Sequence, residues 1–390
     1  MTKKKILFIN YEYPPLGGGG GHACEQIAKE LAIKGHDVSV MTSRFKGLTN
    51  KEVREGVTIH RIPTIRKDIE RCAVFEMLVF LIASLFFCVG LYVRERPQIV
   101  ISFFSIPCGP AALFLKTFFG VPYIVALRGG DVPGFLPEQL ALFHKMTGWL
   151  TRLIWRHALA LTANSRGLAE LATRFYGHRE IRVIANGVDK RFYFGPEQRA
   201  RSPQSYAKTD GARLTVLTAG RLGPQKKVGR LIEAMLRVKQ KGYTDIKLLI
   251  AGDGPERDQL EALAGQHGLL NSQVFFKGWC DRDQLISHYR AADVFSLASD
   301  FEGMPNVVLE AMASSLAIVA TTSPGTEDLV VDGVNGYLVK NTEVHFEDKW
   351  IELAAMRERL LLFQAASHER AQMYTWRAAA DGYEVLWGGG

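Results

Sequence analysis

The stretch that decides the fold is Ser299-Asp-Phe-Glu-Gly-Met-Pro-Asn-Val-Val-Leu-Glu-Ala-Met312. Residues 293–298, just before it, form a short apolar run that predicts a buried parallel strand. The apolar residues after Asn306 predict a helix, and Pro305 suits its first turn, where a missing N–H costs nothing. The stretch therefore predicts a strand, a loop and the start of a helix.

The loop of this stretch is a candidate ligand site. Open α/β sheets bind ligands at the carboxyl ends of their strands, and free N–H groups at a helix start favour an anion such as phosphate. Glu302 and Glu310 would repel phosphate, but their carboxylates can accept hydrogen bonds from the hydroxyls of a sugar and a ribose. Two glutamates at this spacing are also common as ordinary surface charges, so the spacing alone leaves both interpretations open.

The rest of the chain shows the same alternation of strand and helix patterns, in two halves. Strand patterns at 5–10 and 37–42 flank a helix pattern at 23–34, and this βαβ unit predicts a doubly wound parallel sheet. A second series starts with a strand pattern at 214–219. Residues 194–210, between the halves, are rich in Gly, Pro, Ser, Gln and charges, which is typical of a linker.

Composition indicates a soluble globular chain with a basic first half. Apolar residues make up 47% and charged residues 23% of 390 residues. Residues 1–190 hold 25 Lys and Arg against 15 Asp and Glu, whereas the remainder holds 23 against 25. The basic half fits an anionic membrane surface or acceptor, and no nucleic-acid motif is present. Five scattered cysteines without a C-x2-C pair and a start without a signal-peptide pattern favour a reducing, cytoplasmic location.

A run of five glycines, 17–21, follows the first strand pattern and precedes His22. It is neither a P-loop, because no Gly-Lys-Ser/Thr follows, nor a G-x-G-x-x-G motif, because His22 occupies the third glycine position. Backbone without side chains can approach a ligand closely. His22 is a candidate acid or base, or simply a residue at a helix start.

Residues 77–93 contain no charge, and basic residues flank them. A membrane span is one interpretation, but strand patterns at 57–62 and 98–103 would then split one sheet across a bilayer. A helix that docks on anionic lipid and a buried core helix are the two alternatives. The flanking cations are Arg66, Lys67, Arg71, Arg94 and Arg96.

Cations follow the strand pattern that opens the second half. Arg221 and Lys226 lie five apart at a strand–helix junction, where two cations can stabilise a leaving diphosphate. In the first half, Arg128 and Asp131 flank a Gly-Gly turn after the strand pattern at 123–127. This turn is a site candidate, and a salt bridge between its two charged residues is the alternative.

Glu302-x7-Glu310, with Gly303-Met-Pro305 in place, resembles the signature of the retaining glycosyltransferases of family 4. The resemblance extends from Pro14-Pro15 through Gly220-Arg-Leu-x3-Lys226 to Asp332-Gly-Val-Asn-Gly336. It implies the GT-B fold, in which two Rossmann-like, doubly wound parallel-sheet domains face each other across a cleft. The domains expected are an acceptor domain at 1–190, a linker at 191–212, a nucleotide-sugar domain at 213–373 and a helix at 374–390 that crosses back to the first domain.

The resemblance also implies residue roles. Arg221 and Lys226 would bind the diphosphate, Glu302 a sugar hydroxyl and Glu310 the ribose, while His22 and Asp131 complete the catalytic candidates. Arg128 stands where relatives often carry His. Helix amides and the two cations would replace a metal, so no metal or other cofactor is expected, and Asp281 of the Asp281-Arg-Asp283 triplet is expected to cap a helix. The further donor-binding residues are Gly17, Gly18, Gly220, Gly278, Gly303, Met304, Pro305 and Asn306.

The expected function is transfer of a hexose-type sugar from a UDP- or GDP-sugar to a membrane-associated glycolipid or growing cell-surface glycan. The protein would work at the inner face of the membrane and touch anionic lipid through its basic first domain. A nucleotide-sugar epimerase of the same fold and a non-catalytic nucleotide-sugar-binding protein are the alternatives. The residues leave the sugar, the base, the acceptor and the oligomeric state open.

Overall fold

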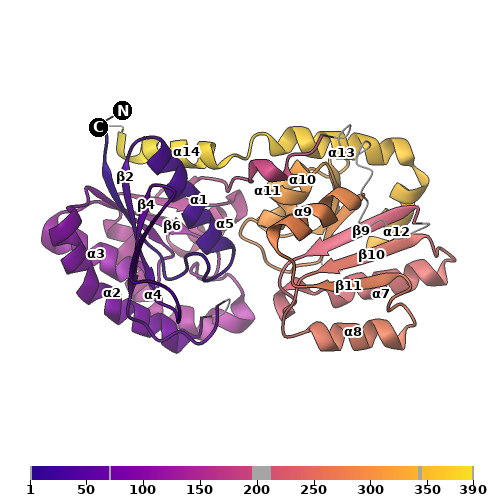
Figure 1. The fold of residues 1–390 in the computed structure, drawn as a ribbon, viewed down its shortest axis with the longest axis horizontal. Helices are drawn as coiled ribbons and strands as arrows, with labels where there is room; N and C mark the ends of the chain where they lie inside the picture. Colours follow the sequence, from indigo (N-terminus) through magenta and orange to yellow (C-terminus); the bar gives the residue numbers. More distant parts are fainter. Residues whose placement is uncertain (1, 70–71, 196–211, 341–344, 389–390) are drawn as a thin grey trace. The chain divides into compact units, whose positions relative to one another are not determined.

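The structure is a computed structural model that describes residues 2–69, 72–195, 212–340 and 345–388. The chain forms two compact units, drawn in Figure 1. The first consists of residues 1–187 and 376–390, and the second of residues 188–375. Each unit is built on its own wound sheet, so the predicted α/β fold class is confirmed.

The first unit holds an eight-stranded sheet in the order β3-β4-β2-β1-β5-β6-β7-β8. Neighbouring strands run parallel, except in the hairpin of β3 and β4 at one edge. The inner strands read as continuous apolar runs because helices cover both faces of the sheet. The strands are β1 Lys5–Ile9, β2 Asp37–Ser43, β3 Lys51–Arg54, β4 Val57–Ile62, β5 Ile99–Phe103, β6 Tyr123–Leu127, β7 Ala160–Ala163 and β8 Ile181–Val183.

The helices of the first unit form two layers. The chain steps from β1 to β2 in one direction and from β4 to β8 in the other, so right-handed crossovers place α1 on the opposite face from α2 to α5. Helix α14 packs against α1, while α2, α3 and α4 pack in succession (Figure 1). The helices are α1 Gly19–Ile33, α2 Val74–Glu95, α3 Gly109–Phe119, α4 Pro137–His157, α5 Arg166–Phe175 and α14 Trp376–Gly388.

The second unit has a fully parallel sheet in the order β11-β10-β9-β12-β13-β14. This is the Rossmann order 3-2-1-4-5-6, in which ligands bind where the winding reverses, here between β9 and β12. The strands are β9 Leu214–Ala219, β10 Ile246–Ala251, β11 Val274–Gly278, β12 Val294–Leu297, β13 Ala317–Thr321 and β14 Gly336–Val339. The helices are α7 Gly229–Gln240, α8 Arg257–Gln266, α9 Arg282–Ala291, α10 Asn306–Ala313, α11 Thr326–Leu329, α12 Phe346–Ala355 and α13 Arg357–Ala371, with short 3-10 turns η1 Lys190–Phe192 and η2 Pro224–Lys226.

The structure corrects several boundaries. Helix α1 begins at Gly19 rather than at residue 23, so part of the glycine run is helical. Pro305 is the cap residue before α10, one position outside the helix. The segment at 188–194 lies on the second unit, because Phe194 N donates to the Ala313 carbonyl at 3.1 Å. Most of the predicted linker, residues 196–211, lies outside the described residues, as does Arg71.

Among the described residues, α2 alone is long and apolar enough to cross a membrane by length and composition. The strands on either side of it, β4 and β5, belong to one sheet and are joined through β2 and β1. A bilayer crossing would separate these paired strands. Helix α2 is therefore a helix on the face of the sheet.

Candidate active site

The reversal between β9 and β12 places two loops side by side at the carboxyl edge of the second sheet. The loop after β9 carries Arg221 and Lys226, and the loop after β12 carries Glu302. Lys226 Nζ donates to Glu302 Oε1 at 2.7 Å. The residue Glu302 is only 8% exposed, whereas the Lys226 side chain is 24% exposed, so two predicted site residues form a partly buried ion pair.

A second group of charges links the start of α7 and the residue before it to the loop after β12. Arg230 donates to Asp300 Oδ1 at 2.6 Å and to the Ala298 carbonyl at 3.2 Å. Lys227 Nζ lies 3.8 Å from Asp300 Oδ2. The two adjacent lysines thus face different acids, and Lys226 is the one that meets Glu302. No sequence motif marks Asp300 or Arg230, because isolated charges near a loop carry no signal of their own.

The neighbouring loop after β10 packs backbone to backbone on the loop after β9. A Cβ at Gly252 would lie 1.9 Å from the Gly220 carbonyl oxygen, and one at Gly254 would lie 2.3 Å from the Leu222 carbonyl oxygen. Gly220 itself has φ +127° and open space where a Cβ would be. These close approaches of glycine backbone therefore fix the position of the loop that carries Arg221. Among the described residues, the Arg221 side chain has no hydrogen-bond or ion-pair partner.

Glu310 sits on α10 and is held by a buried phenol. The Tyr289 hydroxyl lies 3.1 Å from Glu310 Oε2 and 3.0 Å from the Val307 carbonyl, so its single proton is shared between these two acceptors. Burial, and then the Glu310 charge, raise the pKa of Tyr289 well above its usual value, so the phenol stays protonated and donates. Tyr289 was missed because nothing in the sequence marks a tyrosine on another helix as a partner of Glu310.

The start of α10 is packed closely but has no side-chain cap. Pro305 is the cap residue and accepts nothing through its side chain, and Met304 is buried. A Cβ at Gly325 would lie 2.4 Å from the Gly303 carbonyl oxygen, and Gly325 N donates to the Glu302 carbonyl at 2.9 Å. The loop after β13 thus supports the loop of Glu302. Asn306 is the first helical residue.

Gly278 lies at the end of β11, beside the loop after β10. Its φ is +69°, and its carbonyl accepts from Gly252 N at 2.8 Å. Trp279 follows it and is largely exposed. Gly278 therefore belongs to the same carboxyl edge as the loops that carry the ion pair.

In the first unit, the glycine run opens α1. A Cβ at Gly17 would lie 2.5 Å from the Glu12 side chain, and one at Gly20 would lie 2.6 Å from the Phe104 ring. Gly18, the cap of α1, is exposed and has open space where a Cβ would be. Packing thus explains part of the run that sequence reasoning assigned to ligand contact.

His22 lies in the first turns of α1 and is half-buried. Its Nδ1 is 3.7 Å from a Glu25 carboxylate oxygen, and its ring packs edge-on against Trp376, with 5.6 Å between ring centroids. The role of His22 as an acid or base stays a prediction.

Asp131 shapes its own loop. Its buried carboxylate accepts from the N–H groups of Arg128, Gly129 and Ser105 at 2.8–3.1 Å, and from the Ser105 hydroxyl at 3.2 Å. Burial raises the pKa of Asp131, although these hydrogen bonds oppose the shift. The turn salt bridge considered from the sequence is wrong, because the Arg128 guanidinium donates instead to Asn186 and Tyr383. These contacts favour loop shaping over the predicted contact with a substrate hydroxyl.

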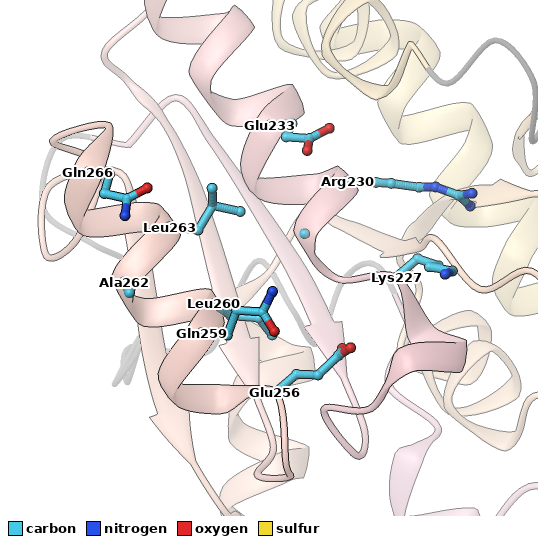
Figure 2. Close-up of a pocket in the computed structure, with 10 residues that line it drawn as sticks. Lys227, Arg230, Glu233, Glu256, Gln259, Leu260, Ala262, Leu263 and Gln266 are labelled. Carbon is cyan, nitrogen blue, oxygen red and sulfur yellow. The ribbon is translucent and has the colours of Figure 1, made fainter.

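The second unit also carries a hollow of about 540 Å³ between α7 and α8. Figure 2 shows Lys227 and Arg230 extending away from α8, while Gln259, Leu263 and Gln266 line its other side. None of the predicted donor-binding residues lines it. This hollow lies beside the candidate site rather than forming it.

Two groups of acidic residues resemble metal-binding sets. Asp281 caps α9 by accepting from Gln284 N at 2.8 Å, as predicted, which gives the D-x-D triplet a structural role. His345, Glu347 and Asp348 lie close enough to share an ion. Glu347 is paired with Arg237 at 2.8 Å, and Asp348 is paired with Lys241. Both acids of this trio are therefore already neutralised by cations.

Comparison with known proteins places this site in a family. The family model described as "Glycosyl transferases group 1" matches residues 200–363, and "Glycosyltransferase Family 4" matches residues 17–192. Glycogen synthase of Mycobacterium tuberculosis is 27% identical, covering 97% of this chain and 91% of that protein. A GDP-mannose-dependent alpha-(1-6)-phosphatidylinositol monomannoside mannosyltransferase of Mycolicibacterium smegmatis is also 27% identical, covering 87% and 86%.

Solved structures show the same fold. Sucrose-phosphate synthase from Thermosynechococcus elongatus aligns with a TM-score of 0.85 at 19% identity and covers 99% of both chains. Anabaena HepE in complex with UDP aligns with a TM-score of 0.78 at 19% identity, covering 99% of this chain and all of that one. Two family models that together span both units, and neighbours of the GT-B fold, lead to one conclusion. The chain belongs to the group 1 glycosyltransferases.

Proposed function

We propose that this glycosyltransferase is a retaining, metal-independent enzyme that moves a hexose from a UDP- or GDP-sugar to a membrane-associated glycolipid or growing glycan. The observation that carries the proposal is the ion pair of Lys226 and Glu302 at the reversal of the second sheet. Arg221 and the uncapped start of α10 belong to the loops around the same reversal. These are the groups that a sugar diphosphate needs.

The ion pair suggests how the donor is held. An ammonium has three N–H donors, so Lys226 can keep Glu302 and still donate to a phosphate oxygen. Glu302 then holds the cation where charge grows on the leaving diphosphate. A carboxylate has two acceptor oxygens, and the second would accept from a sugar hydroxyl. Glu310, held by Tyr289, would accept from the ribose.

Charge balance supports chemistry without a metal. Arg221, Lys226 and the amides at the start of α10 together offer positive potential to the diphosphate. Retention of the anomeric configuration would follow if the leaving phosphate took the acceptor's proton on the same face of the sugar. In that mechanism no side chain has to act as the base, which leaves His22 with a positioning role.

A membrane-associated acceptor is supported by the first unit. Phe75, Leu78, Ile82 and Phe86 recur at helical spacing on α2 and are all exposed. We call these four residues the outer stripe. Apolar helix faces of this kind dock on bilayers when basic residues accompany them, and each Lys or Arg near an anionic surface contributes about 1 kcal/mol. The Mycolicibacterium relative is named for a phosphatidylinositol mannoside acceptor.

The test is turnover with a panel of UDP- and GDP-sugars, with and without membrane extract as acceptor. We expect sugar transfer in the presence of EDTA, with a product anomer that NMR shows to match the donor. Donor that interconverts with another nucleotide sugar without acceptor would identify an epimerase. Binding without turnover, unchanged by Glu302→Gln, would identify a non-catalytic binding protein. Either result would overturn the proposal.

A further inference from the structure

Helix α2 has two apolar faces, of which the sheet covers only one. Its inner face consists of Phe80, Ser84, Cys88 and Leu91, all buried in the unit, together with the buried Glu76 near its start. The outer stripe lies on the other face, and Phe86 is 75% exposed. Its spacing continues to Gly90 and then to Arg94, so the stripe ends in a glycine and a cation.

At that end the surface is hollowed. A hollow of about 520 Å³ lies between the C-terminal half of α2 and the edge hairpin of β3 and β4. Phe86, Phe87, Leu91, Ile62 and Pro63 form its apolar lining, and Gly90 leaves open space where a Cβ would be. The polar lining consists of Asn50, Lys51, His60, Arg61 and Arg94.

The cations of this lining are unequally paired. Arg61 donates to Glu52 at 2.8 Å and to the Thr49 carbonyl at 3.2 Å, and His60 contacts Glu95. The Lys51 and Arg94 side chains are both exposed and form no hydrogen bond or ion pair with any described residue, although the Lys51 charge lowers the pKa of the nearby Glu95. The hollow therefore combines an apolar lining with two cations that are available to an anion.

We propose that this hollow binds one anionic phospholipid of the bilayer on which α2 docks. An acyl chain would lie against Phe86, Phe87 and the gap at Gly90, and the phosphate would meet Lys51 and Arg94. The chemistry of the lining selects this ligand. A purely apolar ligand would leave the two cations without an anion, and a free phosphate would leave the phenylalanine side chains exposed to water. The inference rests on the proposed membrane association and not on the sugar transfer.

The experiment uses the full-length protein and soluble short-chain lipids. Dihexanoyl-phosphatidylglycerol should raise the melting temperature by about 2–4 °C at saturation, because a ligand that binds only the folded state stabilises it. Dihexanoyl-phosphatidylcholine and inorganic phosphate should each give less than a quarter of that shift. An equal shift with either ligand would overturn the proposal. Equal stabilisation by the phosphatidylcholine would mean that the site recognises only acyl chains, and equal stabilisation by phosphate would mean that it recognises only negative charge.

Variants test the site itself. Lys51→Glu/Arg94→Glu should abolish the shift, and Gly90→Phe should abolish it by filling the hollow. Arg174→Glu/Arg182→Glu removes the same charge from exposed positions on α5 and β8, at the opposite end of the sheet, and should keep the shift. Retention of the shift in Lys51→Glu/Arg94→Glu would overturn the proposal, as would a dimer in sedimentation velocity that Phe86→Ser dissociates. Nucleotide-sugar turnover should persist in every variant. If the wild-type protein showed no turnover at all, that result would count against the proposed function and not against the lipid site.

Discussion

The Lys226 ammonium lies 2.7 Å from the Glu302 carboxylate, although 76 positions of sequence separate the two residues. The contact joins the loop after β9 to the loop after β12, where the winding of the sheet reverses. The strand order therefore brings the two groups together. A transition state whose charge grows on a diphosphate benefits most from a cation that does not have to move.

The first prediction concerns this pair. Lys226→Met should lower kcat/KM for the donor by about 10²–10³-fold, the usual loss when one group that stabilises transition-state charge is removed. Glu302→Gln should lower it as well, because the ammonium loses the acceptor that holds it. The double variant should lose little more than the worse single variant, since groups that act as a unit are not additive. Steady-state kinetics measure all three.

The matched control is Lys227→Met, which removes the adjacent ammonium that faces Asp300. It should change kcat/KM by less than about threefold, because that ion pair is half-exposed and such pairs contribute little. Additive losses for Lys226 and Glu302 would show that the two side chains act independently.

The second prediction concerns the phenol that holds Glu310. Tyr289→Phe removes the hydroxyl that donates to Glu310 and should raise KM for the donor about five- to tenfold, equivalent to one ordinary hydrogen bond. The value of kcat should stay within about twofold. Tyr193→Phe is the control, because it removes a hydroxyl bonded to the Ala371 carbonyl at 2.8 Å, away from Glu310. An equal rise of KM in both variants would point to a general loss of stability instead.

Much of the second unit could be predicted because its strands are buried on both faces. The strand patterns at 214–219 and 293–298 are apolar runs, and they contain β9 and β12. In the first unit, by contrast, the short helix α3 and the edge strand β3 were missed. Strand β3 pairs on one side only and carries polar residues, so it lacks the continuous apolar signal.

The site was predictable where motif residues meet through the strand order, and unpredictable where side chains meet by tertiary packing. Lys226 and Glu302 were both named from motifs. Asp300, Arg230 and Tyr289 were not, because their contacts depend on loop paths and helix positions that no local pattern encodes. For Asp131 the sequence located a functional-looking turn, but only coordinates reveal that its carboxylate is occupied by its own loop.

The third prediction concerns the close approach of two loops. Gly325→Ala should destabilise the protein by about 1–3 kcal/mol, because its Cβ would lie 2.4 Å from the Gly303 carbonyl oxygen and something must shift. The shift would displace the loop of Glu302, so donor turnover should fall more than tenfold even at temperatures where the variant is folded. Urea unfolding and kinetics measure the two effects.

Gly265→Ala is the control for this variant. Gly265 is an exposed residue of α8 with open space where a Cβ would be. Alanine there should stabilise the protein by about 0.5–1 kcal/mol and leave turnover unchanged. If Gly325→Ala were as well tolerated as Gly265→Ala, the close approach of the loops would not be a constraint in solution.

The fourth prediction is a pH dependence of stability in the first unit. Glu384 of α14 accepts from His36 at 2.7 Å and contacts Lys34, and its side chain is only 3% exposed. Burial alone would raise the pKa of Glu384, but the hydrogen bonds and charges of Lys34 and His36 outweigh burial and lower it. A lowered pKa in the folded state stabilises above the unfolded value of about 4.3, and this stabilisation is lost as the pH falls through the folded value.

Glu384→Gln should therefore cost about 2 kcal/mol at pH 7, the contribution of hydrogen bonds to a charged group. The difference from the wild type should shrink below about pH 4 and vanish once the wild-type carboxyl is protonated. Urea unfolding from pH 7 to pH 3 measures both. Asp381→Asn is the control, because Asp381 also meets Lys34 but is half-exposed, and it should change stability by less than about 0.5 kcal/mol. A penalty for Glu384→Gln that stays constant down to pH 3 would mean that shape, rather than charge, anchors α14 to α1.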